Sequence, residues 1–154
     1  SRPMATLLVE VEVEGAELSE ALLTQFEELT QSVASSHDLQ GPVSLVLIDD
    51  EQMRELNSQF RSKDRTTDVL SFDLGPLPAP QGAEEMVCKE IYISVEQAHR
   101  QASDLGVSQS EELARLFVHG LLHLSGWDHE TEEKLHAMEQ ETDAILARIG
   151  LLPQ

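Results

Sequence analysis

The segment from Ser108 to Leu124 is apolar over most of the circumference of the helix that it would form, and this feature constrains the fold most strongly. A helix that is apolar on most sides needs neighbouring elements to cover it. We therefore expect this helix at the centre of the domain, packed against a sheet. Its large apolar residues are Leu113, Leu116, Phe117, Val118, Leu121, Leu122 and Leu124.

Two histidines on this helix, with a third just beyond it, predict a metal site. His119 and His123 are four residues apart and therefore share one helix face. Gly126 can end the helix in a left-handed conformation, which lets His129 supply a third imidazole from the following loop. Three protein ligands leave a fourth position open for water, whereas structural zinc sites close all four positions, usually with cysteine. The spacing therefore indicates metal-dependent catalysis.

The same histidines have a simpler interpretation. His119 and His123 could be partly buried, hydrogen-bonded helix residues, with His129 an ordinary loop residue. Gly126 at the turn favours the metal site over this alternative. Three further histidines have no partner at ligand spacing and are expected to be solvated: His37, His99 and His136.

Apolar periodicity along the chain predicts an alternation of strands and helices. Strands are expected at 9–14, 43–48, 68–72 and 87–94, and helices from 19 to the Gly41-Pro42 break and at about 50–60, 94–105, 108–124 and 130–149. Alternating valine and glutamate in the first strand indicates an edge strand with its charges outward. The proline-containing segment 75–82 is expected to be a surface loop.

This order predicts one small α+β domain over residues 1–154, with a roughly four-stranded mixed sheet packed against about five helices and the metal-binding helix central. Residues 94–97 and 108–111 resemble capping boxes that start helices, and Gly106 can end the helix between them. Asp49 or Asp50 can cap the helix that follows the second strand.

Composition narrows the class of protein. The chain has one cysteine, Cys88, which excludes an intrachain disulfide and fits a reducing compartment. It has no apolar run long enough to suggest a membrane span, and the start at Ser1 has no apolar signal region. We expect a cytoplasmic protein without a membrane partner, in which residues 1–3 were added ahead of a native Met4.

The formal net charge is −19, so the field of the whole molecule should repel polyanions and weigh against promiscuous nucleic-acid binding. Four of the ten basic residues nevertheless fall between Arg54 and Arg65, with Arg61, Lys63 and Arg65 at alternate positions. By charge alone, this window fits a local positive site and scattered surface bases equally well.

The spacing of the three histidines and Gly126 also occurs in the metzincin metalloproteases. In those enzymes a glutamate follows the first histidine and acts as the general base. Here that position is Gly120. Without a carboxylate, peptide hydrolysis loses a proton acceptor that is typically worth about 10²- to 10⁴-fold in rate. The sequence therefore disfavours a metzincin-like protease.

The run His119-Gly-Leu-Leu-His-Leu-Ser-Gly-Trp-Asp-His129 resembles the signature of the YbeY family of bacterial and organellar endoribonucleases. A second block, Asn57 to Phe72, resembles that family's upstream motif, an arginine followed by Thr-Asp-Val-Leu-Ser-Phe. Element order and length match the family from end to end. The chain departs from the family pattern at two places. Lys89-Glu90-Ile91 stands where Gly-Asp-Ile is usual, which puts any role of that acidic turn in doubt here. Trp127 stands where tyrosine is commoner, a conservative change.

The resemblance implies a zinc-dependent, single-strand-specific endoribonuclease that acts in ribosomal RNA maturation and ribosome quality control. Carried over by position, the ligands of one Zn²⁺ are His119, His123 and His129, and the arginine needed for activity is Arg61. His119 and Arg61 are accordingly the candidate catalytic residues. Zinc can activate water and polarise a phosphoryl oxygen, while a guanidinium offers two hydrogen bonds to phosphate. Ni²⁺ can substitute at such a site.

Supporting roles stay open at this point. Asp128 can orient a ligand histidine or cap the turn to the last helix. Asp68 and Ser71 can position Arg61 or contact substrate, or belong to an ordinary strand. Asp128 and Glu130 are the candidates for a general base, and participation of the substrate 2′-hydroxyl is equally open.

The expected partners are single-stranded RNA, ribosomal RNA in particular, and a ribosomal protein. The net charge predicts either a divided surface, with Arg61, Lys63, Arg65 and Arg115 around the histidines, or recruitment through a protein. Two alternatives remain. One is a metal-dependent hydrolase of a substrate that is not a nucleic acid. The other is a ribosome-assembly adaptor in which zinc only stiffens the end of the histidine-bearing helix.

Overall fold

The computed structural model of the chain describes residues 5–60, 69–77 and 86–151. Its elements follow the expected order, so the prediction of a small α+β domain is confirmed. They are β1 (Thr6–Val11), α1 (Glu20–Ser36), β2 (Pro42–Ile48), α2 (Asp50–Phe60), β3 (Val69–Leu77), β4 (Met86–Ser94), α3 (Val95–Leu105), α4 (Gln109–Leu124) and α5 (Glu132–Ile149). Among the described helices, none combines the length and the apolar character that crossing a membrane requires.

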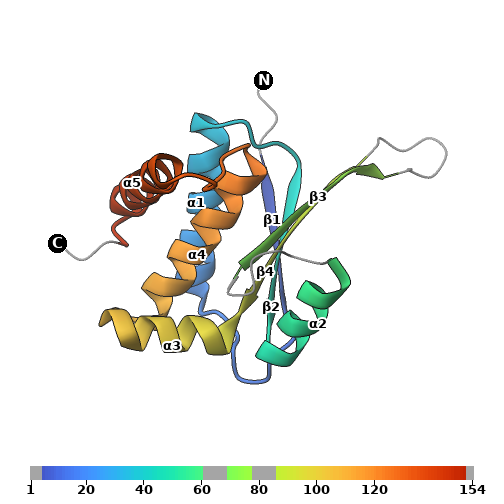
Figure 1. The fold of residues 1–154 in the computed structure, drawn as a ribbon, viewed down its shortest axis with the longest axis vertical. Helices are drawn as coiled ribbons and strands as arrows, with labels where there is room; N and C mark the ends of the chain where they lie inside the picture. Colours follow the sequence, from blue (N-terminus) through green and yellow to red (C-terminus); the bar gives the residue numbers. More distant parts are fainter. Residues whose placement is uncertain (1–4, 61–68, 78–85, 152–154) are drawn as a thin grey trace.

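The strands form one mixed sheet in the order β1-β2-β4-β3 (Figure 1). β1, β2 and β4 are parallel, and β3 runs antiparallel beside β4. Parallel neighbours need a crossover connection, which α1 provides between β1 and β2. β1 lies at an edge, as its alternating valines and glutamates predicted.

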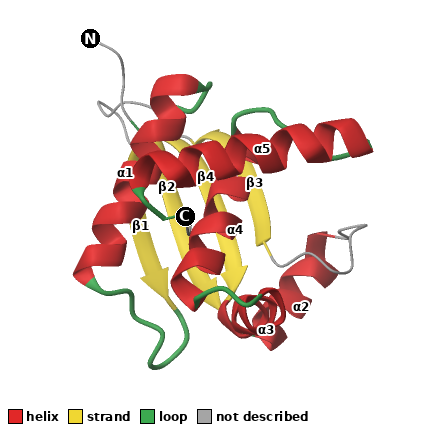
Figure 2. Ribbon diagram, turned by 90° about the vertical axis from the view of Figure 1, so that its left-hand side faces the viewer, coloured by secondary structure: helices red, strands yellow, loops and turns green. Residues whose placement is uncertain are grey.

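Helices cover both faces of the sheet (Figures 1 and 2). On one face α1, α3, α4 and α5 enclose the larger core cluster, which includes Phe26, Leu45 and Phe117. On the other face α2 places Met53 in a smaller cluster with Val46. The two faces of the sheet therefore have separate apolar cores.

The helix that carries His119 and His123 is central, as expected. α4 packs against α1, α3, α5 and the two strands β3 and β4. The rings of Phe26 on α1 and Phe117 on α4 stack with centroids 4.9 Å apart and planes within 5°. Both rings are fully buried, so α1 and α4 are held in a fixed relation.

α4 approaches the sheet closely at Gly120. A Cβ atom placed on Gly120 would lie 2.8 Å from Cγ2 of Ile91, a fully buried β4 side chain. The hydroxyl of Ser71 in β3 donates a hydrogen bond of 3.4 Å to the Gly120 carbonyl. The separation of the helix from β3 and β4 thus depends on the absence of a side chain at position 120.

Two strand predictions were wrong in their bounds. β1 starts at Thr6 and ends at Val11, so Val13 lies beyond its end. β3 continues through Gly75 to Leu77, a stretch that was expected to belong to a loop. An edge strand pairs on one side only and therefore tolerates proline, and a register shift between Asp73 and Gly75 accommodates the change of direction.

The helix boundaries mostly follow the predicted caps. Ser94 and Ser108 accept hydrogen bonds from the amides of Gln97 and Glu111 at the starts of α3 and α4, and Gly106 ends α3 with φ 69°. α2 begins after Asp49, the first of the two candidates, whose carboxylate accepts from the Gln52 amide at 2.8 Å.

The last helix starts two residues later than expected. Its N-cap is Thr131, whose hydroxyl accepts a hydrogen bond of 3.1 Å from the Lys134 amide. Glu130 therefore belongs to the turn that precedes α5 and not to the helix.

Replacing Gly120 by alanine should destabilise the fold. Alanine favours a helix by about 1 kcal/mol over glycine, but overpacking a rigid core costs about 1–3 kcal/mol, and the β-branched Ile91 cannot move its Cγ2 aside. We expect Gly120→Ala to lose about 1 kcal/mol of unfolding free energy in urea denaturation. In an Ile91→Ala background the same change should be neutral or stabilising. A single variant as stable as the parent would contradict the close contact.

Candidate metal centre

The end of α4 is built to turn the chain back toward the helix. The C-cap is Ser125, and Gly126 follows with φ 102°. The Gly126 amide donates to the His123 carbonyl and the Trp127 amide to the Leu122 carbonyl, both at 3.0 Å. This is the Schellman arrangement, so the prediction that Gly126 ends the helix is confirmed.

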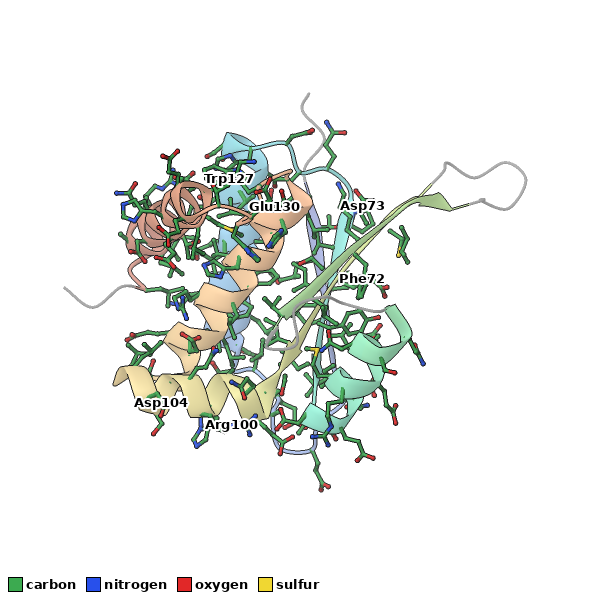
Figure 3. All side chains as sticks on the ribbon, in the orientation of Figure 1. Phe72, Asp73, Arg100, Asp104, Trp127 and Glu130 are labelled. Atoms are coloured by element: carbon green, nitrogen blue, oxygen red, sulfur yellow. The ribbon has the colours of Figure 1, made fainter. Side chains whose placement is uncertain are left out.

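This turn brings His129 back beside the helix. The rings of His123 and His129 have centroids 5.0 Å apart and planes at 82°. Trp127 and Glu130 flank the segment that carries His129. Figure 3 shows both at the end of α4 that lies away from Arg100 and Asp104 of α3. Two of the three predicted ligands therefore meet from the helix and from the loop.

His119 lies one turn earlier and is largely buried. Burial, and then the charges of Arg115, His123 and His129, lower the pKa of His119 to about 4. Burial and His129 also lower the pKa of His123, an effect that Asp128 partly offsets. Both α4 imidazoles are therefore neutral near pH 7, the form in which a ring nitrogen can bind a metal.

The donor chemistry suits a transition metal, although the rings are not gathered around one point. Nε2 of His119 is buried and has no hydrogen-bond partner within residues 5–60, 69–77 and 86–151, an exception that an ion or a water could satisfy. Within the described ranges, no three His, Cys, Asp or Glu side chains are close enough to hold an ion. His119, His123 and His129 would therefore have to close together around a metal.

The hydroxyl and carboxylate candidates next to the histidines have structural partners. Ser71 is bound to the Gly120 carbonyl, as described above. Asp128 accepts a hydrogen bond of 3.1 Å from the Glu130 amide, which is the main cause of its lowered pKa, and pairs with Lys134 at 3.4 Å. Of the two roles considered for Asp128, the structure favours capping the turn to α5.

The Lys89-Glu90-Ile91 departure from the family pattern lies inside β4 and is not an acidic turn. Lys89 is buried and donates a hydrogen bond of 2.7 Å to the Gln40 carbonyl. Glu90 accepts from the Tyr92 hydroxyl at 3.1 Å. Both side chains have structural partners away from the histidines.

An ion pair adjoins the histidines on the first turns of α4. Glu112 is fully buried, and both its oxygens accept hydrogen bonds of 2.8 Å from Nε and Nη2 of Arg115. Donation of these hydrogen bonds to the Glu112 carboxylate raises the pKa of Arg115. Arg115 and His119 line a pocket of about 380 Å³ between α4 and α5, together with Glu139 and Asp143. Arg115 thus lies beside the histidines, as expected, but its charge is paired with that of Glu112.

The remaining basic candidates fall outside the described residues. This concerns the predicted phosphate clamp Arg61 and its neighbours Lys63 and Arg65, and also Asp68. The divided surface expected around the histidines therefore stays a prediction.

One histidine was misplaced by the sequence interpretation. His37 was expected to be solvated, but its side chain is only 17% exposed and contacts both Trp127 and Glu141. Its partners lie far along the chain, so no local spacing could reveal them. His99 and His136 are exposed, as expected.

Comparisons with known proteins give a matching family model, similar sequences and a similar fold. The family model described as Endoribonuclease YbeY matches residues 9–150. Proteins named Endoribonuclease YbeY from Rhodopseudomonas palustris and Moorella thermoacetica are 38% and 42% identical, over 98% and 87% of this chain and 80% and 90% of their own lengths. The solution structure of a Thermotoga maritima protein superposes with a TM-score of 0.56 at 26% identity, covering 94% of this chain and 91% of that one.

Loss of Arg115 should leave the buried carboxylate of Glu112 without a counter-charge. Breaking a buried pair costs about 3–5 kcal/mol, and because Arg115 is 31% exposed we expect about 2–3 kcal/mol for Arg115→Ala in chemical denaturation. The double variant Glu112→Leu with Arg115→Met removes both charges and should recover most of this loss. A single variant as stable as the parent would show that Glu112 is not desolvated.

Proposed function

The chain belongs to the YbeY family of endoribonucleases, and from that premise we propose that it is a zinc-dependent enzyme that cleaves single-stranded RNA in ribosomal RNA maturation and ribosome quality control. Membership gives the broad activity, endonucleolytic hydrolysis of RNA. The observation that supports a metal in this chain is Nε2 of His119, one helical turn before His123, which is buried and has no hydrogen-bond partner among the residues that the structure describes.

The proposed ligands are His119, His123 and His129. The two helix imidazoles are held neutral by burial, and the Gly126 turn supplies the third. Zinc bound there would act as a Lewis acid toward a phosphodiester, and three ligands leave room for an oxygen. Ni²⁺ would fit the same imidazoles.

Arg61 is the proposed phosphate clamp. A guanidinium can donate two parallel hydrogen bonds to a phosphate and stays charged at any pH the protein tolerates. This role rests on the likeness to the family motif, because Arg61 lies outside the described residues.

The environment of Gly120 argues against the protease alternative. A glutamate at this position would have to replace the contact with Ile91, so the proton acceptor of the metzincins has no room beside His119. Asp128 accepts a hydrogen bond from the Glu130 amide through one carboxylate oxygen. The general base is left unassigned between Asp128 and Glu130, and participation of the substrate 2′-hydroxyl is equally open.

Substitution of the proposed catalytic residues should abolish RNA cleavage without unfolding the protein. Changes near a metal typically cost about 10- to 100-fold, so loss of the ligand in His119→Ala should cost at least about 100-fold with a fluorescent single-stranded RNA. Arg61→Ala should lower the rate by a comparable factor, and chelation should mimic His119→Ala until zinc is restored. The exposed His136→Ala is the matched control.

Equal cleavage by the parent and by both variants would contradict the proposal. Activity on a non-nucleic substrate alone would favour the other hydrolase. RNA or ribosomal-protein binding that survives in an inactive chain would favour the adaptor.

RNA binding should weaken as the salt concentration rises. A chain of net charge −19 has only local basic residues to offset its repulsion of RNA, and each released counterion adds to the salt dependence. With about three phosphate contacts, we expect single-strand affinity to fall by roughly tenfold or more between 50 and 200 mM salt. A ribosomal protein should restore it, as fluorescence anisotropy with and without that protein would measure. Salt-independent binding would contradict a cationic clamp.

A further inference from the structure

We propose that His37 is a positioning residue for the metal centre: its imidazole holds Trp127, and thereby the loop that presents His129. This inference rests on the proposed function, because it concerns the same three-histidine site. It assigns a role to a side chain 82 to 92 positions away from the histidines, at the end of a helix that carries none of them.

His37 is itself firmly placed. It is the C-cap of α1, and its amide donates a hydrogen bond of 2.7 Å to the Val33 carbonyl. Its own carbonyl accepts from the Leu39 amide at 3.0 Å. α1 is in turn fixed to α4 through the stacked rings of Phe26 and Phe117. The backbone that carries the imidazole therefore cannot shift independently of the ligand helix.

The imidazole bridges two further elements. Its ring and that of Trp127 meet edge to face, with centroids 5.3 Å apart and planes at 87°. Nε2 lies 2.5 Å from Oε2 of Glu141 on α5, which accepts its hydrogen bond. A bond to the carboxylate fixes the rotation of the ring, and the ring then presents a defined surface to the indole.

Trp127 is the link to His129. Its amide is bound to the Leu122 carbonyl, and its side chain packs against the main core. The next residue, Asp128, is fixed on the other side by the Glu130 amide. His129 stands between these restraints, with its ring beside that of His123. Because the ligand rings must still close around an ion, small shifts of this loop should change metal affinity.

His37 would make the same contacts with Glu141 and Trp127 if it only held α1 and α5 together, as a structural latch. The test therefore measures the stability of the fold and the affinity for metal separately. The variants are His37→Ala, His37→Phe and Glu141→Gln, with His136→Ala as the control histidine. Each purified full chain is titrated with Zn²⁺ against a chromophoric chelator, and its Co²⁺ complex is examined by visible absorption. Thermal unfolding of the metal-free chains gives the stability of each variant.

We expect His37→Ala to bind Zn²⁺ about tenfold more weakly and to shift the Co²⁺ spectrum, because the loop is released. His37→Phe keeps an aromatic edge against Trp127 and should regain most of the affinity, while Glu141→Gln should lose less than His37→Ala. His136→Ala should match the parent.

Two results would overturn the inference. One is a His37→Ala chain that is less stable but has the Zn²⁺ affinity and Co²⁺ spectrum of the parent, which is the signature of a latch alone. The other is a His37→Phe chain that binds Zn²⁺ as weakly as the alanine variant. If His37→Ala does not fold, a His37→Phe chain that binds Zn²⁺ about tenfold more weakly than the parent overturns the inference in the same way. A parent chain that binds no Zn²⁺ would instead refute the proposed function.

Discussion

The close approach of α4 to the sheet at Gly120 is the constraint on which the rest of the structure depends. Because no side chain separates the helix backbone from Ile91, α4 can lie against β4, and Ser71 of β3 can reach its carbonyl. His119 directly precedes Gly120 in the chain, and its Nε2 is buried. The same glycine stands where the metzincins have the glutamate that acts as their general base.

The ligand region combines a rigid helix with a loop that is restrained at several points. The Schellman turn at Gly126 reverses the chain, and the Trp127 side chain packs against the larger core cluster. The carboxylate of Asp128 accepts a hydrogen bond from the Glu130 amide and so restrains the loop beyond His129. These restraints bring His129 to His123 without placing all three rings around one centre. Such a site is partly preorganised, and the free energy of binding a metal would complete it.

Much of this could be predicted from the sequence because it is encoded locally. Apolar periodicity predicted the order of the helices and strands. The positions of His119, His123 and Gly126 predicted where the helix ends and that the following loop brings His129 to His123. The order of strands and the extension of β3 past Gly75 depend on pairing between distant segments, which periodicity does not contain. His37 escaped notice for the same reason, since its partner Glu141 is 104 residues away.

The most direct test of the central claim is X-ray absorption at the zinc edge of the chain loaded with one Zn²⁺. Three converging imidazoles predict three histidine nitrogens at about 2.0–2.1 Å and one further light ligand that exchanges with solvent. Fewer than three imidazoles, or a sulfur ligand from Cys88, would contradict the account.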